Sequence, residues 1–166
     1  MKHPKLFLAV VLVSASATVA AAKNDTAFAI KAAQGGIAEV DFGRLAGDSA
    51  ADPKVKEFGQ KMVTDHSAAN DDLQAAAAKD GITLPQTASK KQHQAARRLG
   101  QLKGDAFDRE YARMMVKDHE EDVALFRKEG ASGQDADLKA FAQKTLPTLE
   151  AHLKMARELP GAASRK

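Results

Sequence analysis

Residues 52–81 read DPKVKEFGQKMVTDHSAANDDLQAAAAKDG, and they carry the start, the end and the buried face of one long helix. Asp52 suits the N-cap position and Pro53 the first helical position. Gly81 suits the position just past the last turn. Between these ends, apolar residues recur at spacings of three and four, which is typical of a helix with one buried face. His66 lies on that apolar stripe.

Three further amphipathic segments accompany this helix. Similar apolar spacing predicts long helices over about 26–46, 105–129 and 135–159. Composition agrees, because Ala, Lys, Glu and Gln favour helices and no segment alternates like a strand. The connection over 82–104 is long enough to return along the bundle and includes a short amphipathic helix, about 89–102. The chain is therefore predicted to be all-α, an up-down-down-up four-helix bundle with a short extra helix in the crossover connection.

The first 22 residues are predicted to be a secretory signal peptide. A basic start precedes an apolar run over 6–13, and small residues lead to Ala22. That run is shorter than the ~20 residues that span a bilayer. The mature chain, residues 23–166, is expected to form one helical-bundle domain with its core at about 25–160. The expected location is the periplasm, or the outer-membrane periphery, of a bacterium.

Composition argues against several classes of function. Removal of the signal takes two of the 25 basic residues, which leaves 23 against 22 acidic ones, a net charge of +1. Bulk charge therefore gives no argument for nucleic acid as a partner. Cys is absent, which excludes disulfides and thiolate ligands. The sequence has no nucleophile elbow, phosphate loop or dinucleotide fingerprint, so no catalytic residue is predicted. After the signal, no segment is predicted to span a membrane.

One short motif occurs twice. Residues 62–66 read MVTDH and residues 115–119 read MVKDH, with an aromatic residue four positions before each Met. The two helices that carry the motif are predicted to be variants of one design.

Several motifs together resemble a known family. They are Glu39 after a Gly-Gly pair, the two Asp-His motifs, Gly104-x-x-Phe107-Asp108-x-x-Tyr111, and Leu146-Pro147-x-Leu149-x-x-His152. Over roughly residues 25–160 they resemble the bacterial exported family named domain of unknown function 4142. The resemblance implies a ferritin-like helical bundle and export. It supplies no catalytic residue, because the activity of that family is not established.

Four polar residues fall on the apolar stripes, one on each long helix: Glu39, His66, His119 and His152. Buried polar groups need partners, since an unpaired one costs several kcal/mol. Three imidazoles and a carboxylate suit a divalent transition metal, with Asp65 and Asp118 as outer residues that would orient the imidazoles. The alternative is structural: neutral core imidazoles bond to backbone carbonyls or nearby carboxylates.

Two further considerations bear on a metal site. A di-iron carboxylate centre is not expected, because no Glu is followed by His three residues later. The predicted helix ends place Glu39 ~12 Å from the end of its helix and His66 ~20 Å into the next. A kink at Pro147 or unequal helix ends would close this gap; otherwise the polar residues form two separate clusters.

The sequence thus leaves three hypotheses for function. The first is a non-enzymatic envelope protein with a structural, stress-related or binding role. The second is a metal-binding bundle with its site in the core. The third is a binder of anionic envelope surfaces through the basic connection, which contains Lys90, Lys91, His93, Arg97, Arg98 and Lys103.

Overall fold

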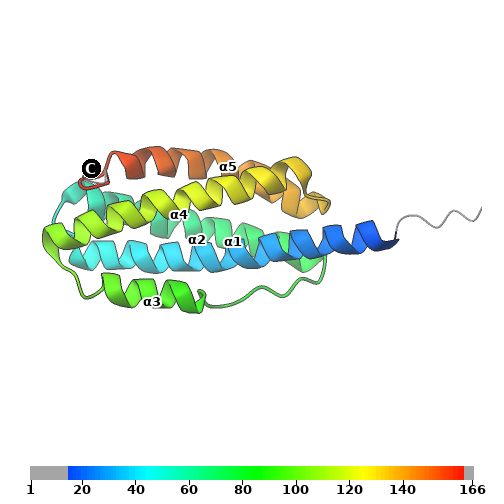
Figure 1. Cartoon of the computed structure of the whole chain (residues 1–166), viewed down its shortest axis with the longest axis horizontal. Helices are drawn as coiled ribbons and strands as arrows, with labels where there is room; N and C mark the ends of the chain where they lie inside the picture. Colours follow the sequence, from blue (N-terminus) through cyan, green and yellow to red (C-terminus); the bar gives the residue numbers. More distant parts are fainter. Residues whose placement is uncertain (1–14, 163–166) are drawn as a thin grey trace, which may run out of the picture.

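A computed structural model describes residues 15–162, with side chains described from residue 24 onward. This part of the chain contains helices and no strand, which confirms the predicted all-α class. The helices are α1 (Ala15–Ser49), α2 (Pro53–Lys79), α3 (Lys90–Leu99), α4 (Gly104–Ser132) and α5 (Ala136–Arg157). The four long helices lie side by side in an elongated bundle, and the short α3 lies along its outside (Figure 1). None of the described helices is long and apolar enough to cross a membrane.

The direction of the helices follows from which of them touch. α1 packs against α2 and α4, and α5 packs against α4 and α2, so α2 and α4 occupy opposite corners of the bundle. At the start of α4, the Asp108 carboxylate accepts hydrogen bonds from the backbone N–H groups of Ala51 and Asp52. The starts of α2 and α4 therefore lie at the same end, which gives the predicted up-down-down-up order.

The two hairpins, α1–α2 and α4–α5, cap one another at their tips. Asp108 lies 3.1 and 2.8 Å from the two N–H groups that precede α2. In the same way, Asp25 of α1 accepts from Gln134 and Asp135 before α5, at 3.0 and 2.7 Å. Each carboxylate satisfies N–H groups that a loop would otherwise leave without a partner.

The first helix differs from its prediction at its beginning. The predicted start near residue 26 is wrong, because α1 begins at Ala15. Asp25 therefore does not cap its own helix and instead holds the distant loop before α5. Residues 1–14 of the predicted signal peptide lie outside the described residues. Its remaining residues, 15–22, contribute backbone to α1.

The hairpins also share an internal sequence repeat with an offset of 83 residues, which the two capping carboxylates reveal. Matching pairs at this offset include Asp25 and Asp108, Phe28 and Tyr111, Glu39 and Asp122, Asp52 and Asp135, and Phe58 and Phe141. The bundle is thus two related hairpins around an approximate two-fold axis. The MVxDH motif does not follow this symmetry, because it lies on α2 and α4, whereas the 83-residue offset pairs α2 with α5 and α1 with α4.

Glycines let α1 and α2 approach closely. A Cβ added to Gly59 would lie 2.6 Å from the Cβ of Ala46 and 2.8 Å from the backbone oxygen of Gly43. A Cβ on Gly36 would overlap the side chain of Asn70. The glycine at position 36 therefore leaves room for the Asn70 side chain of α2.

A polar layer divides the core into two apolar clusters. The first, at the end of the bundle covered by α3, includes Phe42, Phe58, Met62, Phe107, Tyr111 and Met115. The second, toward the other end, includes Phe28, Leu73, Phe126, Leu138, Phe141 and Leu149. Glu39, His66, His119 and His152 are buried but belong to neither cluster. The fold therefore positions all four predicted site residues inside the bundle.

Candidate metal centre

The four polar residues on the stripes come from α1, α2, α4 and α5, and they meet in one layer. Glu39, His66, His119 and His152 are 2%, 5%, 0% and 0% exposed. The gap expected between Glu39 and His66 is narrowed by the length of α1. Because α1 continues to Ser49, Glu39 lies ~15 Å from its end, while His66 lies ~20 Å into α2. The remaining offset is less than one helical turn.

The three imidazoles converge. One ring nitrogen from each of His66, His119 and His152 lies within 4.8 Å of the others. The ring centroids form a nearly equilateral triangle with sides of 5.4, 5.4 and 5.8 Å. In a tetrahedral complex with bonds of ~2.0–2.1 Å, such nitrogens lie roughly 3.4 Å apart. Small side-chain rotations would therefore bring all three within coordination distance of one ion.

Two of the imidazoles are hydrogen-bonded through one nitrogen, and the third lies close to a carboxylate through one nitrogen. The Nδ1 atom of His119 lies 2.9 Å from the Met115 carbonyl oxygen, to which an Nδ1–H can donate. The Nε2 atom of His152 lies 2.8 Å from Asp65 Oδ2. The Nδ1 atom of His66 lies 2.9 Å from Glu39 Oε2. Partners of this kind fix the tautomer and the orientation of metal-binding histidines.

The other nitrogen of each ring has no partner among the described residues. The unpartnered atoms are Nε2 of His66, Nε2 of His119 and Nδ1 of His152, all fully enclosed. Leaving a buried acceptor unsatisfied costs about 1–3 kcal/mol. Three neighbouring rings, with centroids 5.4–5.8 Å apart, therefore contain three unpaired nitrogens in the core.

Burial also keeps the imidazoles neutral. It lowers the pKa of His66 and of His152 to about 4, and it lowers the pKa of His119. Neutral imidazoles carry the free lone pairs that a metal ion requires. Burial therefore favours the neutral form of each ring, in which one nitrogen carries a lone pair.

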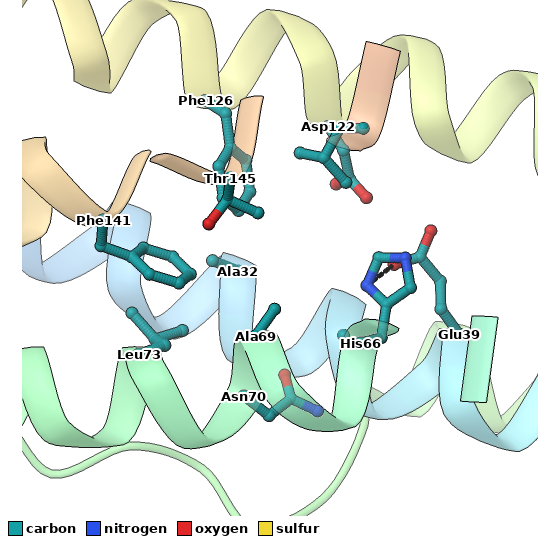
Figure 2. Close-up of a pocket in the computed structure, with 12 residues that line it drawn as sticks. Ala32, Glu39, His66, Ala69, Asn70, Leu73, Asp122, Phe126, Phe141 and Thr145 are labelled. Atoms are coloured by element: carbon teal, nitrogen blue, oxygen red, sulfur yellow. Dashed lines mark ion pairs between the residues drawn. The ribbon is translucent and has the colours of Figure 1, made fainter. Parts of the chain in front are cut away.

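Two carboxyl groups face one another beside His66. Glu39 on α1 and Asp122 on α4 point toward each other (Figure 2), and they are equivalent positions of the 83-residue repeat. Burial raises the pKa of Glu39 to about 7, although the nearby His119 opposes the shift. Burial and the Glu39 charge raise the pKa of Asp122 well above its ordinary range. Two facing carboxyls in an apolar core resist ionising together.

The two outer aspartates predicted from the repeated motif differ in their contacts. Asp65 is hydrogen-bonded to His152 and also lies 2.9 Å from Lys61 Nζ. Burial raises the pKa of Asp65, but Lys61 and His152 outweigh that effect and leave it lowered. Asp118 makes no hydrogen bond or ion pair with an imidazole in the described part of the chain. Burial raises the pKa of Asp118 to about 6.

The sequence pattern did not assign Asp122 or the Met115 carbonyl to the site. The 83-residue offset was the available signal for Asp122, because it pairs that residue with Glu39. The Met115 carbonyl had no signal in the residue types, since a backbone atom one helical turn before His119 is present whatever the side chain.

The basic connection lies outside the bundle and takes no part in the centre. Lys90, Lys91, Arg97 and Arg98 are exposed on α3, as is His93. Lys103 instead donates to Ser49 Oγ at 2.7 Å, so it helps to fix the connection to α1.

Comparison with known proteins agrees with this architecture. The sequence profile of domain of unknown function 4142 matches residues 12–159. The chain belongs to this family. Among solved structures, it is similar to a protein of the family DUF305 from Streptomyces coelicolor, described as secreted. The identity is 14%, the TM-score is 0.68, and the match covers 81% of this chain and 89% of the other, so the two share a fold. No curated protein matches the chain.

The raised pKa of Glu39 predicts how the Glu39→Gln substitution changes stability with pH. The folded pKa of about 7 exceeds the ordinary 4.5, so the unfolded chain loses this proton first as pH rises. Wild-type protein in chelator should therefore lose stability relative to the variant between about pH 4.5 and 7, with a limit of about 1.4 kcal/mol per pH unit. Urea unfolding midpoints at a series of pH values measure this difference. Parallel profiles for the two proteins would contradict the assignment.

Proposed function

We propose that this DUF4142 protein is an exported helical bundle that binds one divalent transition-metal ion in its core. His66, His119 and His152 are the proposed ligands, through Nε2, Nε2 and Nδ1. The observation that carries the proposal is that His66, His119 and His152 each offer one ring nitrogen within 4.8 Å of the others, and that one buried nitrogen of each ring has no hydrogen-bond partner in the described part of the chain.

The structural hypothesis accounts for this layer less well. An imidazole that serves only the fold is expected to have its buried nitrogens satisfied, because an unsatisfied one costs about 1–3 kcal/mol. Here each ring has a partner at one nitrogen only: Nδ1 of His119 and Nε2 of His152 are hydrogen-bonded, and Nδ1 of His66 contacts Glu39. A metal ion bound by all three rings would satisfy the three unpaired nitrogens at once. A buried water is the alternative occupant.

Glu39 was expected to be the fourth ligand, and the geometry supports a different role for it. Its carboxylate lies 2.9 Å from His66 Nδ1 and 3.4 Å from His119 Nδ1, which are not the nitrogens proposed to bind the ion. We therefore propose that Glu39 orients two imidazoles and supplies negative charge near the ion. An ion with three nitrogen ligands would keep at least one open coordination position, as zinc does in catalytic sites.

Removal of any one ligand is expected to abolish tight binding. His66→Ala, His119→Ala and His152→Ala should each lose the ion, whereas His93→Ala on exposed α3 should keep it. Zn²⁺ at about 100 times its Kd should stabilise the wild type by about 2.7 kcal/mol, a rise in Tm of roughly 5–10 °C. Metal content after purification without chelator and Tm with and without Zn²⁺ provide the measurements. An equal Zn²⁺ response from all four variants and the wild type would refute the ligand set.

Substitutions of the two aspartates of the repeated motif should differ in their effect on metal affinity, because only Asp65 is hydrogen-bonded to an imidazole. Asp65→Asn removes the carboxylate that fixes His152, so it should weaken metal affinity by about 10–100-fold. Asp118→Asn is the matched control, because Asp118 makes no hydrogen bond or ion pair with an imidazole in the described part of the chain. Competition with a chromogenic chelator measures both affinities. If the two variants bind equally, Asp65 does not support the site.

A second candidate function rests on the exposed surface of α3, and it is independent of the core site. Within the described chain, the side chains of Lys90, Lys91, Arg97 and Arg98 form no ion pair or hydrogen bond. Cations of this kind can associate with anionic headgroups, at about 1 kcal/mol for each residue near the surface.

Vesicle binding tests this second candidate. Arg97→Gln with Arg98→Gln should reduce salt-sensitive binding to phosphatidylglycerol vesicles by about 30-fold. Arg127→Gln with Arg157→Gln is the charge-matched control, since those residues are paired with Glu150 and Glu120 away from α3. Sedimentation with vesicles at low and high salt gives the comparison. Equal loss in both double variants would show that only net charge matters, and absent binding would reject the candidate.

A further inference from the structure

A small cavity adjoins the proposed metal centre on the side of the second apolar cluster. Its volume is ≈ 20 Å³, enough for one water molecule. Figure 2 shows the residues around it, with His66 and the two facing carboxyl groups on one side and Phe126, Phe141 and Leu73 on the other. The opposite side of the imidazole triangle is closed, because the Phe58 ring lies 6.2 and 6.3 Å from the rings of His119 and His152.

The internal repeat explains why a space exists at this position. At the 83-residue offset, His66 pairs with Leu149, His119 with Gly36, and His152 with Ala69. All three counterparts line the cavity. The approximate two-fold axis therefore relates the imidazole cluster to the cavity. On the cavity side, smaller or apolar residues replace the imidazoles.

Polar groups with unsatisfied bonding capacity border the cavity. His66 belongs both to the imidazole cluster and to the cavity wall, and its Nε2 has no partner among the described residues. Glu39, also in the wall, is 2% exposed, and its Oε2 lies 2.9 Å from His66 Nδ1. An atom in the cavity would therefore have a hydrogen-bonding group beside it.

We infer that the cavity is the binding site for an external ligand of the metal ion, and that it admits a ligand of one or two heavy atoms. This inference rests on the proposed function. Three imidazoles leave an open position on the ion, and the cavity is a space beside His66 that can receive a ligand. The ligand class is water, a monatomic anion such as fluoride, or a diatomic molecule such as nitric oxide.

The walls set the size limit. Leu73, Phe126, Phe141 and Leu149 are buried apolar side chains, so they neither move into solvent nor bond to a longer anion. Azide and thiocyanate have three heavy atoms in a line and would have to displace one of these side chains. Leu149 is the most informative of them, because it takes the place of an imidazole in the symmetry of the bundle.

The test uses the chain loaded with Co²⁺, whose visible spectrum reports its ligands. Fluoride and nitric oxide should each change the spectrum of the wild type, and azide and thiocyanate should bind more weakly than fluoride by about tenfold or more. Leu149→Ala should enlarge the cavity and remove the discrimination against azide. Leu138→Ala is the matched control, since Leu138 is a buried leucine of the same helix and cluster that does not line the cavity.

The outcomes separate this inference from the proposal beneath it. If no Co²⁺ is retained, the proposed function fails. If Co²⁺ binds but neither fluoride nor nitric oxide alters its spectrum, the ligand site is overturned while the metal site stands. If azide binds the wild type as well as fluoride does, the size limit is wrong. The wild-type ligand series decides even where a leucine variant does not fold.

Discussion

Unpaired imidazole nitrogens inside an apolar bundle are the constraint around which this structure is organised. A buried acceptor without a partner costs about 1–3 kcal/mol, and three of them lie together here. The other nitrogens of His119 and His152 are hydrogen-bonded to the Met115 carbonyl and to Asp65, and that of His66 lies 2.9 Å from Glu39, so a ring that turned toward another partner would lose an existing contact. Apolar clusters lie on both sides of the layer, and the three nitrogens have almost no exposed area through which solvent could supply the missing bonds.

The two hairpins bring these side chains to one level. Asp25 and Asp108 each fix the loop of the other hairpin, and this reciprocal capping sets how far one hairpin can slide along the other. The approximate symmetry brings Glu39 and Asp122 face to face near the axis. The three histidines have no histidine counterparts at the 83-residue offset. The imidazole cluster therefore lies on one side of the axis, and the cavity lies on the other.

Much of the arrangement was predictable from the sequence, and the contacts that were not predictable have identifiable causes. His66, His119 and His152 stood out because a histidine on an apolar stripe must face the core, and burial confirms that they do. The contact role of Glu39 was harder to assign, since periodicity gives the face of a helix but not which nitrogen of a neighbouring ring a carboxylate reaches. Asp65 and Asp118 occupy equivalent positions of one motif, yet only Asp65 bonds to an imidazole. The neighbouring helix decides this difference, and the motif contains no information about it.

The sequence by itself determined the helical class, the approximate ends of most helices, the crossover order and the inward face of each helix. These properties depend on local capping and on periodicity, which are written in neighbouring residues. Only the tertiary structure decided that the four stripes meet at one level, that Asp122 faces Glu39, and that a cavity adjoins His66. Such features depend on the axial offset between helices. That offset is set by loop contacts between residues more than 50 positions apart, so no local pattern encodes it.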